Sequence, residues 1–247
     1  MISINFPQES IMTSIKQNIA EVINQITLAT EKCGRAADSV QLLAVSKTKP
    51  VEAIEEAIAA GQYAFGENYV QEGVDKVNHF SSHPEKNLLV WHFIGPIQSN
   101  KTRLVAEHFD WVHSIDRIKT AKRLSDQRPT SMAPLQVLLQ VNSSAEATKS
   151  GITLAEVPAL AAEIAAMPNI ELRGLMSIPQ PATDYDSQFA TFKALAVTLE
   201  QLKLTYPNVD TLSMGMSGDM EAAIAAGSTI VRIGTAIFGA RDYGNKE

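Results

Sequence analysis

The stretch LLAVSKTKP, residues 42–50, is a short apolar run that ends in polar residues and a proline. An apolar run of this length, bounded by turn-forming residues, is typical of a buried strand. Pro50 suits the first turn of a helix, and apolar residues then recur at helical spacing until Gly61. The stretch therefore predicts one strand that is followed directly by one helix.

The same alternation of strand and helix recurs along the chain. Eight apolar runs are predicted as strands, namely Leu42–Ser46, Tyr63–Gly66, Val90–Ile94, Trp111–Ile115, Leu135–Val141, Ile170–Met176, Thr211–Met214 and Ile230–Ile233. Their first residues recur about every 27 positions, which is close to the length of one strand–helix unit. Segments with helical periodicity lie between them. Strict alternation predicts a parallel sheet with right-handed crossovers.

Two architectures share this alternation, a closed α/β barrel and a doubly wound open sheet. Eight units is the number found in the barrel, and no Gly-x-Gly-x-x-Gly motif, which a dinucleotide-binding open sheet carries, follows the first strand. An apolar stripe from Ile11 to Ile26, ended near Gly34, predicts a long helix before the first strand. We expect an α/β fold, a (β/α)8 TIM-type barrel with a leading N-terminal helix, forming a single domain over residues 1–247.

The composition restricts the compartment and the partners. Of the 247 residues 45% are hydrophobic and 19% are charged, as in soluble globular proteins. The net charge of −6 argues against a nucleic-acid partner, which needs a basic surface. Cys33 is the single cysteine, so neither an intramolecular disulfide nor a thiolate metal cluster can form. Because the sequence has neither a signal-like N-terminus nor a run long enough to span a membrane, we expect a cytoplasmic protein with no membrane partner.

Lys47 is a candidate nucleophile at the end of the first strand. It follows Leu43 and Val45 at alternate positions and therefore shares their face of the strand. Desolvation in such a place lowers the pKa of an ammonium group and frees the amine for attack. The alternative is an ordinary solvated lysine at a strand end. Lys49 lies nearer the helix start, and we expect it to be solvated.

The last two predicted strands end in small, hydroxyl-bearing turns. One turn runs from Ser213 to Asp219 and the other from Arg232 to Thr235. Backbone N–H groups and hydroxyls in such turns can converge on an anion, and the loops after strands seven and eight commonly bind phosphate in α/β barrels. The alternative for each turn is a simple helix cap. A reactive lysine opposite a phosphate site describes a place for pyridoxal 5′-phosphate (PLP), an aldehyde that forms a Schiff base with lysine.

Six strings in this sequence also match a known family. They are AVSKTKP (44–50), FGENY (65–69), WHFIGPIQSNK (91–101), RGLM (173–176), LSMGMS (212–217) and VRIGTAIFG (231–239). Together they closely resemble the pyridoxal-phosphate homeostasis protein family, in the family's order, from about Gln41 to Gly239. The fold of that family is similar to the N-terminal barrel of alanine racemase, which agrees with the eight units counted above.

The resemblance implies a set of cofactor-binding residues. Lys47 matches the lysine that holds PLP, and Arg232 matches the arginine that faces the pyridine nitrogen. The phosphate contacts match Ser217 with the amide of Gly218, and Gly234 with Thr235, while Asn68 and Met176 would lie beside the ring. Gly218 departs from the family, which often has a residue with a side chain there. An amide contact would survive this change.

The resemblance also implies a function. We expect a cytoplasmic PLP-binding protein that is not an enzyme and that buffers PLP or delivers it to apo PLP-dependent enzymes. We also expect a monomer, because the barrel has no second domain. An arginine can only donate, so Arg232 would leave the pyridine nitrogen unprotonated and weaken the ring as an electron sink. The first alternative is a PLP-dependent amino-acid racemase-like enzyme, although the chain after Thr235 leaves no room for a second catalytic domain. The second is a phosphate-sugar barrel enzyme that uses Lys47 toward its substrate.

Several other residues have a structural interpretation that we prefer. His92 is expected to be a hydrogen-bonded histidine of the third strand and not a general base. Lys149 is expected to be solvated, although it could be a second amine for aldehydes. The spacing of His79 and His83 indicates a helix end and not a metal site.

Three methionines lie near the predicted phosphate loop. We expect Met214, Met216 and Met220 to serve in packing, because methionine fills irregular gaps in protein cores.

Overall fold

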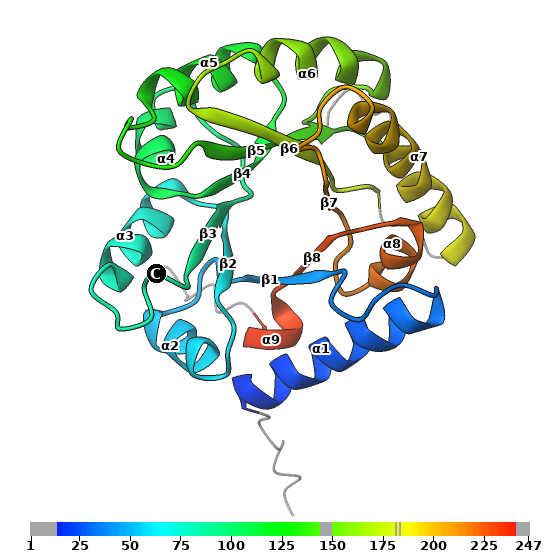
Figure 1. Ribbon diagram of the computed structural model, residues 1–247. Helices are drawn as coiled ribbons and strands as arrows, with labels where there is room; N and C mark the ends of the chain where they lie inside the picture. Colours follow the sequence, from blue (N-terminus) through cyan, green and yellow to red (C-terminus); the bar gives the residue numbers. More distant parts are fainter. Residues whose placement is uncertain (1–13, 144–149, 181, 183, 241–247) are drawn as a thin grey trace, which may run out of the picture.

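The computed structural model describes residues 14–143, 150–180, 182 and 184–240. Within these residues eight parallel strands form a closed barrel in sequence order, surrounded by helices (Figure 1). The strands are β1 (Gln41–Val45), β2 (Ala64–Glu67), β3 (Val90–Phe93), β4 (Trp111–Ile115), β5 (Leu135–Val141), β6 (Ile170–Ser177), β7 (Thr211–Ser213) and β8 (Ile230–Ile233). Each agrees with its predicted bounds to within one residue at either end. The (β/α)8 barrel predicted from the alternation is confirmed, and the open sheet is excluded.

The helices cover the outside of this barrel. They are α1 (Ile15–Lys32), α2 (Val51–Ala59), α3 (Val70–Phe80), α4 (Thr102–His108), α5 (Ile118–Gln127), a 3₁₀ turn η1 (Leu154–Glu156), α6 (Val157–Ala165), α7 (Tyr185–Lys203), α8 (Met220–Ala226) and α9 (Thr235–Phe238). No helix of the described segments is long and apolar enough to cross a bilayer.

The leading helix α1 completes the outer ring. The helix that follows β8, α9, has only four residues and cannot cover the barrel wall by itself. α1 packs between α2 and α8 and against α9, as Figure 1 shows. Its buried face includes Ile19, Val22 and Ile26, and the Asn18 side chain donates a 2.8 Å hydrogen bond to the Ile237 carbonyl in α9. The predicted leading helix is confirmed, although Ile11 lies outside the described residues.

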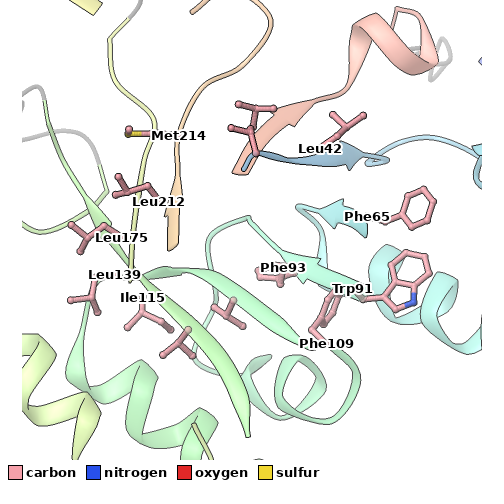
Figure 2. Close-up of a cluster of buried hydrophobic side chains, with 14 of the residues drawn as sticks. Leu42, Phe65, Trp91, Phe93, Phe109, Ile115, Leu139, Leu175, Leu212 and Met214 are labelled. Carbon is pink, nitrogen blue, oxygen red and sulfur yellow. The ribbon is translucent and has the colours of Figure 1, made fainter. Parts of the chain in front are cut away.

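The core has two layers that follow the alternation of side chains along the strands. The larger layer packs between strands and helices, and Figure 2 shows part of it, including Leu42, Phe65 and Phe93. A smaller cluster contains Leu43 and Ile230, with Val45 packed against it. Leu43 and Val45 therefore lie on the same face of β1. This is the strand face that the sequence predicted for these two residues and for Lys47.

The barrel also contains a buried polar chain. His92 Nδ1 and His113 Nε2 are 2.9 Å apart, and His113 Nδ1 lies 2.9 Å from Ser213 Oγ. Ser213 Oγ in turn accepts a 2.7 Å hydrogen bond from Arg232 Nη1. A hydrogen-bonded chain thus runs from Arg232 through Ser213 and His113 to His92. The tautomers of the two histidines are linked, because a ring nitrogen that donates needs an acceptor on the neighbouring ring.

Both histidines are held neutral by their surroundings. Burial lowers the pKa of His92 to about 3. Burial also lowers the pKa of His113 well below its usual value, with further lowering by His92 and Arg232. The hydrogen-bonded structural role predicted for His92 is confirmed.

The other two histidines considered above lie at a helix end, as predicted. α3 ends at Phe80, with His79 in its last turn, and His83 Nε2 lies 3.2 Å from a carboxylate oxygen of Glu55. Within the described ranges no group of three or more His, Cys, Asp or Glu side chains is arranged to hold a metal ion.

We expect the fold to lose stability in acid because of the buried histidines. An unfolded histidine has a pKa of about 6.5, whereas that of folded His92 is about 3. Below about pH 6.5 the unfolded chain therefore binds protons that the folded protein does not bind. The free energy of unfolding should fall as the pH falls, by about 1.4 kcal/mol per pH unit for each such histidine. Denaturant unfolding between about pH 7.5 and about pH 4.5 measures this slope.

A variant of a buried histidine tests this cause. His92→Asn should reduce the slope, because the asparagine amide can hydrogen-bond to His113 and does not titrate. A free energy of unfolding that stays level over this pH range would contradict the neutral burial of His92 and His113.

Candidate functional site

A cavity of about 280 Å³ opens at the carboxyl ends of the strands. This is the face on which α/β barrels carry their functional sites. The lining residues come from the ends of six strands and from the loops that follow them, namely Val45, Lys47, Lys49, Asn68, Ile94, Ile178, Met216, Ser217, Gly218, Arg232, Gly234, Thr235 and Gly239.

Seven of the eight residues predicted to bind a cofactor line this cavity: Lys47, Asn68, Ser217, Gly218, Arg232, Gly234 and Thr235. The eighth, Met176, is 1% exposed in β6 and is not part of the lining. Ile178, two residues further along the same segment, does line the cavity. The sequence thus indicated the right strand, and a contact of Met176 with a ligand stays a prediction.

The turn that carries Lys47 has an unusual backbone. Lys47 is half-buried, and the next residue, Thr48, has φ +62°. This left-handed conformation costs a β-branched residue about 1–2 kcal/mol. The amide of Lys49 closes the turn with a 3.0 Å hydrogen bond to the Ser46 carbonyl. The surrounding structure must therefore hold the turn against this strain.

Lys49 is not solvated, contrary to our expectation. Its Nζ donates to three carbonyl oxygens, those of Phe238 at 2.9 Å, Gly239 at 3.2 Å and Ala240 at 2.7 Å. These carbonyls lie at the C-terminal end of α9, where a cation is favoured. The expectation was wrong because the partners of Lys49 come from the far end of the sequence. The interaction ties the loop after β1 to the segment after β8.

The loop after β7 is a tight turn whose tip faces the cavity. Gly215 has φ +99°, and a Cβ there would lie 2.7 Å from the Ala223 Cβ, so the position requires glycine. The amide of Met216 donates a 2.6 Å hydrogen bond to Asp219 Oδ1. Ser217 lies exposed at the tip between them.

Gly218, the departure from the family pattern, has room for a side chain. A Cβ at Gly218 would meet no atom within 4 Å, and its φ is not in the left-handed region. The change to glycine therefore alters the stiffness of the loop and not its packing.

The segment after β8 forms the other side of this end of the cavity. Gly234 lies close to the first strand, since a Cβ there would be 3.1 Å from the Val45 carbonyl oxygen. Thr235 follows as the exposed first residue of α9. The two loops predicted to bind phosphate therefore meet at one cavity.

Arg232 is a buried cation in the cavity wall. It is 4% exposed, and its Nη1 donates to both the carbonyl and the hydroxyl of Ser213 at 2.7 Å. Its Nη2 donates to the Ser177 carbonyl at 2.9 Å. Burial lowers the pKa of Arg232 to about 10, and the Asp219 carboxylate opposes this effect. The guanidinium therefore stays charged at neutral pH and is fixed in place.

Asn68 presents a buried acceptor that the described residues leave unused. Its Oδ1 is buried and makes no hydrogen bond, and the residue lines the cavity. Its backbone is held by close packing, because a Cβ on Gly95 would lie 2.1 Å from the Asn68 carbonyl oxygen. A buried acceptor without a partner is costly, so this atom is suited to receive a hydrogen bond from a ligand.

Sequence reasoning missed the apolar part of the lining. Ile94 directly follows β3 and could have been found from the period of two that assigns Lys47. Met214 and Met220 are buried, as expected for packing, but Met216 is 39% exposed and lines the cavity. The position of Met216 depends on the turn at Gly215, which the sequence pattern does not resolve. Lys149 lies outside the described residues.

Comparisons with known proteins agree with this arrangement. The family model described as alanine racemase, N-terminal domain, matches residues 8–242. A pyridoxal phosphate homeostasis protein from Vibrio alginolyticus is 66% identical, and the alignment covers 94% of this chain and 100% of the relative. The protein of the same name from Escherichia coli is 60% identical over 95% of this chain and 100% of the relative.

Solved structures show the same fold. PipY from Synechococcus elongatus, solved with PLP bound, is 35% identical with a TM-score of 0.78, and the match covers 92% of this chain and 100% of PipY. An alanine racemase from Corynebacterium glutamicum, 19% identical with a TM-score of 0.63, matches over 92% of this chain and 63% of the racemase, and this likeness concerns the fold alone. Given its identity to curated relatives over nearly its whole length, the chain belongs to the pyridoxal phosphate homeostasis protein family.

Proposed function

We propose that this chain binds PLP in the cavity at the carboxyl ends of the strands and acts in PLP homeostasis, buffering the cofactor or delivering it. The observation that carries the proposal is the meeting of Lys47, Arg232 and the two hydroxyl-bearing loops at one cavity. The names of the relatives, and the PLP-bound structure of PipY, support the same function.

The residues present fit the chemical groups of PLP. Lys47 supplies an amine for a Schiff base with the aldehyde. Ser217 and Thr235 supply hydroxyls for the phosphate, together with the amides of Gly218 and Gly234. Asn68 Oδ1 supplies a buried acceptor that lacks a partner in the described part of the chain.

Arg232 argues for holding the cofactor and against catalysis. When bound, PLP supplies an electrophilic aldehyde and a pyridine ring that withdraws electrons, most strongly when its nitrogen is protonated. Arg232 is held by Ser213 and Ser177 with its charge intact and has no proton acceptor to offer. A guanidinium facing the nitrogen would keep that nitrogen unprotonated. We therefore propose a binding protein that does not catalyse amino-acid reactions.

The proposal extends to location and partners. We propose a monomeric protein of the cytoplasm whose acceptors are apo PLP-dependent enzymes. The cavity supports transfer because it is open at the rim, where Ile178 is 44% exposed and Met216 is 39% exposed. An incoming amine can reach Lys47 from that side.

Borohydride reduction of the PLP-loaded protein, followed by peptide mapping, should place the phosphopyridoxyl group on Lys47. The reason is that Lys47 lines the cavity on the inner row of β1, whereas the Lys49 amine is occupied by three carbonyls. In Lys49→Ala the label should remain on Lys47, and in Lys47→Ala it should disappear. A label found mainly on Lys49 or Lys149 in the wild-type protein would refute the assignment.

Binding should depend on the phosphate group. Losing one hydroxyl contact to a charged group costs about 1.5–3 kcal/mol, so Ser217→Ala should weaken PLP binding by about 10- to 150-fold. Thr198→Ala removes an exposed hydroxyl on the outer helix α7 and is a matched control that should bind as the wild type does. Fluorescence titration with PLP and with pyridoxal measures these effects. Equal affinities for the two vitamers would place the phosphate outside these loops.

The loaded protein should not turn over amino acids faster than free PLP does. Incubation with L- and D-alanine, followed by chiral chromatography, tests for racemisation and transamination. An apo PLP-dependent enzyme mixed with the loaded protein should gain activity. Stereospecific turnover that disappears in Lys47→Ala would show instead that the protein is a racemase-like enzyme.

A further inference from the structure

A buried lysine on the outer helix α3 contacts the turn that carries Lys47. Lys76 is 4% exposed. Its Nζ donates to the Ser46 carbonyl at 2.7 Å, to Glu67 Oε1 at 2.8 Å and to Glu72 Oε1 at 2.6 Å. All three N–H bonds of the ammonium group are thus used. One cation joins the end of β1, the end of β2 and the first turns of α3.

The two carboxylates extend these contacts to both sides of Lys47. Glu67 Oε1 accepts a 2.6 Å hydrogen bond from the Ser46 hydroxyl. Glu72 Oε1 accepts a 2.6 Å hydrogen bond from the backbone N–H of Thr48. The residues immediately before and after Lys47 are therefore both tied to Lys76 through these carboxylates.

Moving this group of charges out of water costs free energy. Apolar side chains could join the same elements without that cost. Glu67 is fully buried, and within the described ranges its Oε2 has no hydrogen-bond partner. Burial raises the pKa of Glu67, an effect that Lys76 and Ser46 oppose. Well-packed apolar residues often stabilise a fold as much as a buried ion pair does. The charged side chains therefore serve to fix one conformation of the backbone. The conformation that they contact is the strained turn at Thr48.

Thr48 is the residue in this turn that needs to be held. Its φ of +62° is in the left-handed region, which β-branched residues rarely adopt. Its Oγ1 is buried and has no hydrogen-bond partner among the residues that the structure describes. The described part of the molecule gives Thr48 one strong polar contact, the bond from its N–H to Glu72. Without that bond, relaxation of Thr48 toward a negative φ would redirect the chain next to Lys47.

We propose that Lys76, Glu67 and Glu72 form a positioning network, the Lys76 clamp, that holds the Ser46–Thr48 turn so that the Lys47 amine meets its aldehyde partner in the cavity. This inference rests on the proposed function, since it deepens the account of how Lys47 receives PLP. Lys76 does not line the cavity, and its hydrogen bond to the Ser46 carbonyl connects it to the turn.

Two variants weaken the clamp at different points. Lys76→Met removes the ammonium group and keeps a flexible side chain of similar length. Glu72→Gln keeps the size of a side chain that is 28% exposed and removes its charge. Asp75→Asn is the matched control, because Asp75 is an exposed acidic residue of the same helix that contacts Gln71 and not the clamp.

Two measurements report on Lys47 itself. The first is the affinity for PLP, followed by absorbance of the Schiff base. The second uses the protein without cofactor: formaldehyde and cyanoborohydride methylate accessible amines, and mass spectrometry gives the rate at Lys47 relative to Lys203 on α7. Lys76→Met and Glu72→Gln should each weaken PLP binding at least tenfold and change the relative methylation rate at Lys47 at least threefold. Asp75→Asn should change neither.

A rescue experiment separates positioning from general stability. Glycine adopts a φ near +62° without steric cost, so Thr48→Gly should let the turn form without the clamp. The double variant Lys76→Met/Thr48→Gly should therefore recover most of the affinity lost in Lys76→Met. A merely structural role for Lys76 predicts no such recovery, because glycine replaces none of the lost hydrogen bonds.

The outcomes distinguish this inference from the proposed function. Wild-type protein that fails to bind PLP would overturn the proposed function, while the methylation rates would still test the clamp. Wild-type binding that is matched by Glu72→Gln, with unchanged methylation of Lys47, would overturn the clamp and leave the proposed function intact. If Lys76→Met does not fold, Glu72→Gln and its combination with Thr48→Gly decide the question in the same way.

Discussion

The parallel pairing of β1 with β8 is the contact on which the rest of the structure depends. Leu42 pairs with Val231 and Leu43 with Arg232, so the first and last strands close the barrel. Because the barrel is closed, its sheet has no exposed edge, and strands that are far apart in the sequence end side by side around one opening. Closure brings the turn of Lys47 beside Gly234, whose missing side chain allows an approach to the Val45 carbonyl. Lys49 reinforces the same seam through carbonyls 189 to 191 residues further along the chain. An open sheet of the same strands would keep their hydrophobic pattern and lose this site.

The architecture could be predicted from the sequence because local hydrophobic patterns indicate each strand and most of the helices. Period-two alternation assigns Lys47 to the face of Leu43 and Val45, and the count of eight units predicts closure. The two loops that follow β7 and β8 were found for the same reason, since barrel geometry says where the ends of those strands meet. What the pattern cannot supply is the partner of a polar side chain that lies far away in the sequence. Lys49 was expected to be solvated because its acceptors lie after β8, far away in the sequence. Lys76 occupies an ordinary position in a helix, and it is buried only because α3 packs against the ends of β1 and β2.

Polar groups inside the barrel are placed where they constrain the cavity. The inner cluster around Leu43 and Ile230 is apolar, whereas the side formed by His92, His113 and Ser213 is a hydrogen-bonded chain that ends on Arg232. An apolar interior would cost less free energy, because His92 Nε2 is buried and has no hydrogen-bond partner in the described part of the chain. The chain helps to fix the guanidinium, because Arg232 Nη1 donates to the Ser213 hydroxyl oxygen and that oxygen is itself hydrogen-bonded to His113. The fold thus accepts a cost in its core to set one cation at the wall of the cavity.

The two basic side chains of the site, Arg232 and Lys47, are held in different ways. Arg232 is fixed by direct hydrogen bonds to β7 and to the end of β6, so its charge is permanent and immobile. Lys47 lies on a turn whose neighbours are tied to buried carboxylates, next to a residue that holds a strained conformation. A rigid donor and a positioned amine at one cavity favour a single orientation of an anionic aldehyde. The part of the wall that carries Arg232 is fixed by its own hydrogen bonds, whereas the position of the Lys47 amine depends on the turn that carries it.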